Sequence, residues 1–261
     1  MTKKASQKRP EHQSSCQSSA AEDPEDVGLE DVYEPAEDTH LLLRVALEEV
    51  GPEDRVLEMG CGHGMISKRL VSLSKNVLAT DVNPNSVKII QRAGIDTVQA
   101  DLFCGIRSKF DLVLFNPPYL PTGEEEVLKG WLNFAFDGGK TGRDTINRFL
   151  EMVSDHLEPE RGRALLLVSS LSGPLEVVKK ARKEGLSVEV VAKEKYFFEE
   201  LLVLRLTHGS IGQNWRAPAN GAPDLGRPSR SHLNIHNISG VGAHLQTKPP
   251  NAPRSNIKQA N

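Results

Sequence analysis

Short apolar runs of strand length recur along the middle of the chain, and segments with helical periodicity separate them. The runs cover residues 55–59, 76–80, 97–100, 111–115 and 163–168, and each is rich in Val, Leu or Phe. Continuous apolar runs of this kind are typical of strands that are buried on both faces of a parallel sheet. Their alternation with helical segments predicts an α/β fold with a doubly wound, mostly parallel sheet.

Helix signals support this prediction. Asn83-Pro84 places a capping side chain directly before a proline at the first helical position. Ser172 and Pro174 open another predicted helix, which Gly185 ends. The last two strand-like runs, 187–192 and 201–206, have no helix between them. We therefore expect them to pair as an antiparallel hairpin at the sheet edge.

Composition divides the 261 residues into three parts. Residues 1–28 are rich in Ser, Gln and charged residues and have almost nothing to bury, which is typical of disorder. Residues 209–261 contain six Gly and six Pro, which also argues against packed structure. We expect a folded domain over 29–208 between a disordered N-terminal tail and a disordered basic C-terminal tail.

The net charge of the chain argues against a strong overall attraction to nucleic acid or to anionic membranes. Lys and Arg number 32 and Asp and Glu 35, so the net charge is −3. The C-terminal tail carries six basic residues and one acid, so subtracting its +5 from −3 leaves −8 for the remainder.

No apolar run is long enough to span a bilayer, and no signal peptide is visible. Three cysteines without C-x-x-C spacing predict neither disulfides nor a metal site. We expect a cytoplasmic protein without a membrane partner.

A glycine-rich turn follows the first predicted strand. Glu58 ends the strand region, and Gly60, Gly62 and Gly64 follow at alternate positions. Glycines let the backbone bend sharply and let a ligand lie against it. Asp81 ends the next strand, where α/β sheets place a carboxylate for the hydroxyls of a ribose. The spacing departs from the dinucleotide fingerprint G-x-G-x-x-G, because the third glycine comes one residue early.

The most specific motif is Asn116-Pro117-Pro118-Tyr119, directly after the predicted strand 111–115. Two prolines have fixed φ angles and no N–H, so the segment is a stiff, extended loop. Asn116 offers an amide oxygen, Pro117 a carbonyl oxygen and Tyr119 a flat face. Two acceptors and an aromatic wall fit a planar –NH2 group on an sp2 carbon. Adenine, cytosine and the glutamine side chain all carry such a nitrogen.

Together these motifs resemble class I S-adenosylmethionine-dependent methyltransferases. The resemblance is strongest to the HemK-related glutamine N5-methyltransferases, in the archaeal and eukaryotic branch that acts on class-one peptide release factors. Two further segments carry it: Val32-Tyr-Glu-Pro-Ala-Glu-Asp-Thr39 and Gly138-Gly-Lys-Thr-Gly-Arg-Asp144. The resemblance implies a Rossmann-like, seven-stranded sheet that ends in an antiparallel hairpin.

The resemblance also implies roles for single residues. The cofactor S-adenosylmethionine would be bound by Thr39, Glu58, Gly60, Gly62, Asp81, Asp101, Leu102 and Asn116. The residues expected to act in catalysis are Asn116, Pro117 and Tyr119, and with Pro118 they would bind the substrate. Thr39 would contact the methionyl end of the cofactor, Asp81 its ribose and Asp101 its adenine amino group.

The partners implied are a peptide release factor as substrate and a small zinc-binding activator that adds strands to the sheet. Two alternatives remain open. An adenine N6-methyltransferase would use the same tetrapeptide on DNA or RNA, with the basic tail as the docking arm, although the acidic body argues against it. A non-catalytic cofactor-binding subunit is disfavoured by the intact tetrapeptide.

Overall fold

The computed structural model describes residues 32–123 and 130–209. The N-terminal tail expected at 1–28 lies outside the described residues, as does the expected C-terminal tail beyond Gly209. The described residues contain no helix that is long and apolar enough to cross a membrane.

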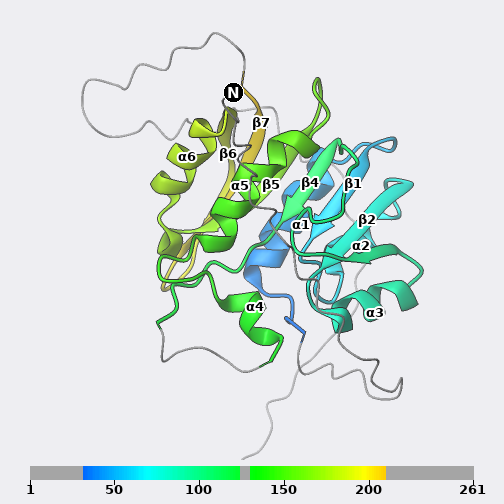
Figure 1. The fold of residues 1–261 in the computed structure, drawn as a ribbon, viewed down its shortest axis with the longest axis horizontal. Coiled ribbons are helices and arrows are strands. Elements are labelled where there is room, and N and C mark those ends of the chain that lie inside the picture. Colours follow the sequence, from blue (N-terminus) through cyan, green and yellow to red (C-terminus); the bar gives the residue numbers. More distant parts are fainter. Residues whose placement is uncertain (1–31, 124–129, 210–261) are drawn as a thin grey trace, which may run out of the picture. The chain divides into compact units, whose positions relative to one another are not determined.

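The strands form one seven-stranded sheet, with the spatial order β3-β2-β1-β4-β5-β7-β6 (Figure 1). Neighbours from β3 to β5 are parallel, whereas β7 is antiparallel to both β5 and β6. The predicted fold class and the C-terminal hairpin are confirmed. The strands are β1 (Arg55–Met59), β2 (Asn76–Asp81), β3 (Asp96–Gln99), β4 (Leu112–Phe115), β5 (Arg163–Ser169), β6 (Leu186–Lys195) and β7 (Glu200–His208).

The helices are α1 (Glu37–Glu49), α2 (Met65–Leu70), α3 (Pro84–Arg92), α4 (Leu132–Phe136), α5 (Asp144–His156) and α6 (Pro174–Lys183). Asn83 caps α3 as predicted, because its side-chain oxygen accepts from the backbone N–H of Asn85 at 2.9 Å. The start of α6 differs from the prediction in its N-cap residue. Gly173 is its N-cap, while Ser172 donates its hydroxyl to the Ser169 carbonyl within a 3-10 turn.

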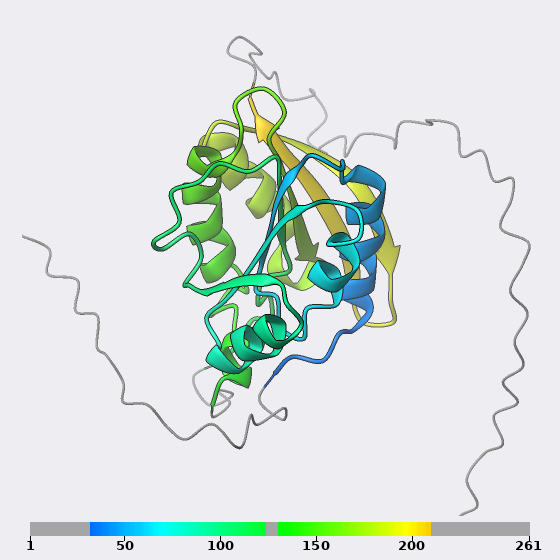
Figure 2. The same cartoon turned by 90° about the vertical axis from the view of Figure 1, so that its right-hand side faces the viewer.

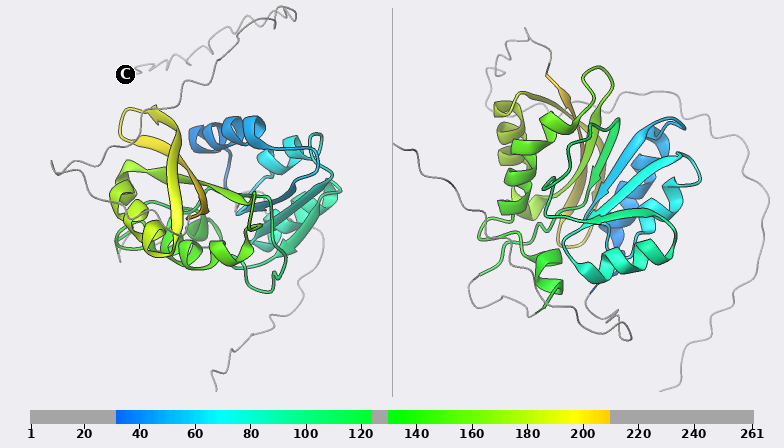
Figure 3. Two further views of the ribbon diagram at one scale, coloured as in Figure 1. Left: turned by 90° about the horizontal axis from the view of Figure 1, so that it is seen from above. Right: turned by 45° about the vertical axis from the view of Figure 1, so that its right-hand side comes forward.

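Helices cover both faces of the sheet (Figures 2 and 3). Leu41, Leu42 and Ala46 of α1 are buried in one cluster with Ile66 and Leu70 of α2. On the opposite face, α5 and α6 build the second large cluster through Ile146, Phe149, Leu150, Val153, Val177 and Ala181. Strands β4 and β5 between them are buried on both sides, as the continuous apolar runs predicted. The same prediction is wrong for β3, which is largely exposed because it lies at the edge of the sheet.

The register gathers the predicted motifs at one edge of the sheet. Met59 at the end of β1 pairs with Thr80 of β2 and with Phe115 of β4. The glycine turn, Asp81 and Asn116 therefore follow neighbouring parallel strands at their carboxyl ends, where ligands bind in open α/β sheets. Because β7 is antiparallel to β5, the turn that precedes Glu200 lies at the same edge.

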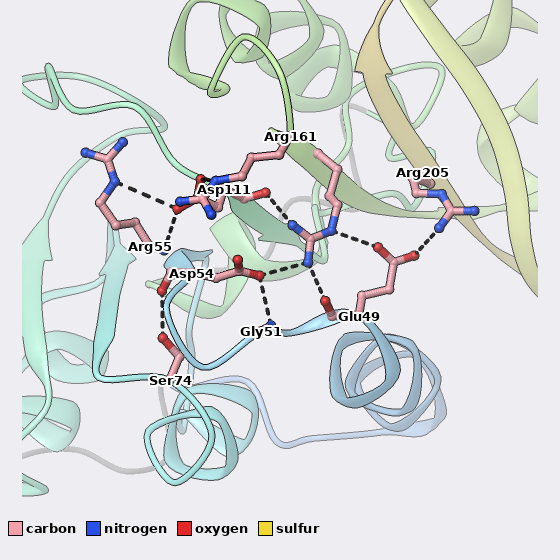
Figure 4. A network of polar contacts seen from close by, with 9 residues as sticks. Glu49, Gly51, Asp54, Arg55, Ser74, Asp111, Arg161 and Arg205 are labelled. Atoms are coloured by element: carbon pink, nitrogen blue, oxygen red, sulfur yellow. Dashed lines mark hydrogen bonds and ion pairs between the residues drawn. The ribbon is translucent and has the colours of Figure 1, made fainter.

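The amino ends of the strands carry a different structure, a network of ion pairs around the buried carboxylates of Asp54 and Asp111 (Figure 4). Arg163 contacts Glu49 at 3.0 Å and Asp54 at 2.9 Å. Asp111 is fully buried, accepts from the backbone N–H of Arg55 and lies 2.7 Å from the Nε atom of Arg161. This network connects the end of α1 to β1, β4 and β5, and it lies at the edge of the sheet opposite the predicted motifs.

Candidate active site

A cavity of about 360 Å³ opens at the carboxyl edge of the sheet. This volume is within the range of small-molecule sites. Every residue that the sequence predicted as a site residue lines it: Thr39, Glu58, Gly60, Gly62, Asp81, Asp101, Leu102, Asn116, Pro117, Pro118 and Tyr119. Residues that are up to 80 positions apart in the sequence therefore meet around one space.

The glycine turn forms one wall of this cavity. Gly60 and Gly62 have φ angles of 66° and 51°, which other residues adopt only with strain. The backbone N–H of Gly62 donates to Asp81 Oδ2 at 2.8 Å, and the N–H of Asn83 donates to Asp81 Oδ1 at 2.8 Å. Burial raises the pKa of Asp81, although these hydrogen bonds lower it. The turn and the acid thus hold each other in place.

Glu58 is buried at the end of β1, and its partner comes from α2. The backbone N–H of Ser67 donates to Glu58 Oε2 at 2.7 Å, and the Ser67 hydroxyl donates to the same oxygen. Burial raises the pKa of Glu58 to about 7, and the nearby charge of Asp81 adds to the effect. Ser67 has no sequence motif of its own, so the sequence did not indicate this contact.

The acceptor loop, which we define as residues 116–119, follows β4. The Oδ1 atom of Asn116 is buried and has no hydrogen-bond partner among the described residues. A buried acceptor without a partner costs free energy unless a ligand or water supplies the donor. Asn116 lines the cavity, and its Oδ1 is an acceptor that no described residue uses.

The lead-in, residues 32–39, brings a buried carboxylate that the sequence did not single out. Asp38 is 4% exposed and accepts from the hydroxyls of Tyr33 and Tyr119. Thr39, a predicted site residue, donates its backbone N–H to Asp38 Oδ1 at 2.6 Å. The cavity thus has its lead-in wall and its acceptor loop joined through Asp38.

Asp101 and Leu102 lie at the rim of the cavity, after β3. Leu102 has a φ of 52°, the only positive value among the non-glycine residues that the structure describes. Such strained residues cluster at functional sites. Asp101 is half exposed, and its Oδ2 lies 2.7 Å from Arg148 of α5. Arg148 also lines the cavity, and the sequence did not indicate it.

The glycine-rich segment 138–144 supports the acceptor loop from behind. Gly138 donates its N–H to the Leu120 carbonyl at 2.9 Å. A Cβ atom at Gly142 would lie 2.3 Å from the Tyr119 carbonyl oxygen, and Gly142 has a φ of 67°. Only glycine allows this close approach, so the segment contributes to the geometry of the active-site rim.

The chain is similar in sequence to proteins of known family. Residues 35–197 match the family model described as "Methyltransferase small domain". A putative protein N5-glutamine methyltransferase of Methanocaldococcus jannaschii is 42% identical over 181 residues, which are 67% of this chain and 90% of that protein. The chain belongs to the HemK-related class I methyltransferases.

Further relatives agree with this assignment. Methyltransferase HEMK2 of Homo sapiens is 34% identical over 68% of this chain and 90% of that protein. Among solved structures, the E. cuniculi Mtq2–Trm112 complex, described as responsible for the methylation of the termination factor eRF1, has a TM-score of 0.56 at 29% identity. That match covers 69% of this chain and 99% of the E. cuniculi chain.

The cofactor of this methyltransferase is S-adenosylmethionine, and the cavity fits it in three respects. Gly60 and Gly62 line the cavity, and their lack of a side chain allows a ligand to approach the backbone closely. The Asp81 carboxylate, a suitable acceptor for hydroxyl groups, lines it. The unpartnered Asn116 Oδ1 adds an acceptor at the acceptor-loop side.

Proposed function

We propose that this methyltransferase transfers a methyl group from S-adenosylmethionine to the N5 side-chain nitrogen of a glutamine in a class-one peptide release factor. The observation that carries the proposal is the buried, unpartnered Asn116 Oδ1 on a loop stiffened by Pro117 and Pro118. The names of the relatives support it, since they include a protein N5-glutamine methyltransferase and release factor glutamine methyltransferases.

The cofactor would be held by the residues that the sequence predicted. Gly60 and Gly62 would lie under its methionyl part, with Thr39 at the methionyl end and Glu58 organising this region. Asp81 would accept from the ribose hydroxyls, Asp101 from the adenine amino group, and Leu102 would contact the adenine. When bound, S-adenosylmethionine supplies an electrophilic methyl carbon, which is bonded to its sulfonium sulfur.

The acceptor loop would orient the substrate amide. An amide nitrogen is a poor nucleophile, because its lone pair is delocalised into the carbonyl group. Asn116 Oδ1 and the Pro117 carbonyl oxygen would each accept a hydrogen bond from one N–H of the substrate amide, and Tyr119 would cover its flat face. The amide nitrogen would gain the methyl group as the S–CH3 bond breaks, and it would release one of its two protons to water. These groups do not ionise near neutral pH, so we attribute the rate to orientation and preorganised polar groups.

We further propose a small activator subunit, with a zinc site of its own, as the partner. The E. cuniculi neighbour supports this proposal, since it is a complex of Mtq2 with Trm112. Strand β3 is an edge strand of the described sheet, and its residue Val98 is 45% exposed. An unpaired edge of this kind can accept a further strand from a partner. Soluble, active enzyme obtained without a partner would contradict this proposal.

Residues 29–208 are proposed as the catalytic unit, and the cytoplasm as its compartment. A chain reduced to 29–208 should retain the methyltransferase activity of the full chain. If removal of residues 209–261 abolishes both the methyltransferase activity and nucleic-acid binding, the result would instead favour an adenine N6-methyltransferase.

Intact mass spectrometry tests the substrate. A purified release factor is incubated with S-adenosylmethionine, a co-expressed activator and either the wild-type enzyme or Asn116→Ala. We expect the release factor to gain one methyl group on a glutamine with the wild-type enzyme and none with the variant. No gain on the release factor, together with methylation of DNA or RNA in a parallel reaction, would replace the glutamine amide by adenine.

A further inference from the structure

Asp38 is a buried carboxylate whose hydrogen bonds come from two parts of the cavity wall, the lead-in and the acceptor loop. Tyr33 Oη lies 2.9 Å from Oδ1 and 2.8 Å from Oδ2, and Tyr119 Oη lies 3.2 Å from Oδ2. The backbone N–H of Thr39 and its hydroxyl both donate to Oδ1. All these donors are neutral groups, and no Lys or Arg within 32–123 or 130–209 forms an ion pair with Asp38.

A buried carboxylate without a cation is costly to the fold unless hydrogen bonds compensate for its desolvation. The other buried carboxylates at the far edge of the sheet, Asp54 and Asp111, have arginine partners. Asp38 instead depends on tyrosine hydroxyls, and it lies within the lining of the cavity. This contrast indicates that Asp38 serves the cavity rather than the stability of the core.

The contact with Tyr119 connects Asp38 to the acceptor loop. The two prolines restrict the backbone before Tyr119, but they leave its side-chain torsions free. A hydrogen bond from the ring hydroxyl to a buried carboxylate restricts those torsions, and hydrogen bonds to charged groups are the stronger ones. Tyr33 is held on the same carboxylate, and its ring packs edge-on against Phe136 with centroids 5.4 Å apart. The carboxylate therefore has a rigid support.

We propose that Asp38 is a positioning residue for methyl transfer, which fixes the ring of Tyr119 as the wall of the acceptor site. The inference rests on the proposed function, because Tyr119 matters only if the loop 116–119 binds the acceptor group. Asp38 acts through Tyr119. Its carboxylate accepts a hydrogen bond from the Tyr119 hydroxyl and does not take part in the methyl transfer itself.

The test uses Asp38→Asn, Tyr119→Phe and the double variant of the full chain with its activator. The asparagine amide can accept from one tyrosine but not from both with equal geometry, so the ring of Tyr119 should lose its fixed place. We expect each single variant to lower kcat about 10- to 100-fold, as small misplacements of reacting groups do. The double variant should lose little more than either single variant, because both remove the same contact.

Asp54→Asn is the matched control. It changes a buried carboxylate of the ion-pair network in the same way, at the opposite edge of the sheet. We expect this variant to lower the melting temperature and to leave kcat unchanged. If Asp38→Asn lowers the melting temperature and leaves kcat as it is in the wild type, Asp38 has only a structural role and the inference is wrong. Additive losses in the double variant would also overturn it.

Two further measurements keep the inference separate from the proposed substrate. S-adenosylmethionine binding, measured by calorimetry, should change less than about threefold in Tyr119→Phe, since this variant removes the contact to the acceptor wall and leaves the Asp38–Thr39 hydrogen bonds in place. A crystal structure of Asp38→Asn with S-adenosylhomocysteine should show the Tyr119 ring displaced, and an unmoved ring would overturn the inference whatever the acceptor is.

If Asp38→Asn does not fold, Tyr119→Phe removes the same contact from the other side. A wild-type enzyme that does not methylate the release factor overturns the proposed substrate alone.

Discussion

Ser67 on α2 holds the buried carboxyl group of Glu58, with its backbone nitrogen 2.7 Å from Glu58 Oε2 and its hydroxyl donating to the same atom. This contact connects the end of β1 to the first helix after the glycine turn. A carboxyl group that lines the cavity thus receives its hydrogen bonds from the protein itself. The ionisation of Glu58 is consequently coupled to the stability of the fold.

The first prediction concerns pH. The pKa of Glu58 is raised to about 7 in the fold, above its ordinary value of 4.5. Between these two values the folded state binds more protons than the unfolded state, so the free energy of unfolding falls as the pH rises. Glu58→Gln should reduce this slope by at most about 1.4 kcal/mol per pH unit. Urea denaturation at several pH values measures it, with the exposed Glu53→Gln as the control. An unchanged slope in Glu58→Gln would contradict the prediction.

The second prediction concerns the cofactor. Asp81→Asn removes the charge from the carboxylate proposed to hold the ribose hydroxyls. Since hydrogen bonds to charged groups contribute about 1.5–3 kcal/mol, the Kd for S-adenosylmethionine should rise about 10- to 100-fold. Isothermal calorimetry measures this change. Asp96→Asn, an exposed carboxylate at the start of β3, should bind as the wild type does. Equal affinity in the two variants would remove Asp81 from the cofactor site.

The third prediction separates acceptor binding from cofactor binding. Asn116→Ala removes the unpartnered oxygen from the cavity, so kcat should fall about 100-fold or more, as it does when a preorganised polar group is lost. The Kd for S-adenosylmethionine should change much less than kcat, because the other seven predicted cofactor residues stay in place. Single-turnover kinetics and calorimetry on the same preparation give both values. A variant with the wild-type rate would exclude Asn116 from the mechanism.

The fourth prediction concerns the support of the acceptor loop. A Cβ atom at Gly142 would come within 2.3 Å of the Tyr119 carbonyl oxygen, so Gly142→Ala must displace the loop. We expect kcat to fall at least about 10-fold, because misplacement of reacting groups is costly. Gly94→Ala is the matched control, since Gly94 has a φ of 75° and its added Cβ would meet nothing within 4 Å. It should cost stability through backbone strain and leave kcat unchanged. A Gly142→Ala enzyme as active as Gly94→Ala would show that the loop tolerates the displacement.

The fifth prediction concerns the ion-pair network in Figure 4. Arg163→Met leaves the buried carboxylate of Asp54 without an ion-pair partner and removes one of the two arginines on Glu49, which should lower the free energy of unfolding by about 3 kcal/mol. Kinetics well below the melting temperature should be unaffected, because the network lies at the edge away from the cavity. Lys179→Met removes an exposed ion pair with Glu176 and should change stability very little. Similar denaturation midpoints for the two variants would mean that the buried network does not stabilise the fold.

The local parts of this protein could be predicted from the sequence, because neighbouring residues determine them. Apolar runs indicated the strands, Asn83-Pro84 the start of α3, and the glycine spacing the turn after β1. The acceptor loop could be predicted as well, since proline restricts its own backbone and the preceding residue. Parallel strands then bring such motifs to one edge of the sheet, which is why every predicted site residue lines the same cavity.

Only the tertiary structure determined which side chains hold these motifs in place. Tyr119 donates to Asp38 across 81 positions of sequence, and Arg148 contacts Asp101 across 47. A hydrogen bond requires two groups within about 3 Å in the right direction, and this condition depends on how whole helices pack on the sheet. Sequence periodicity indicates that a helix packs, but it does not indicate which polar group of that helix meets a given strand end. The residues that line the cavity could therefore be predicted from the sequence, whereas the contacts that support them depend on the packing.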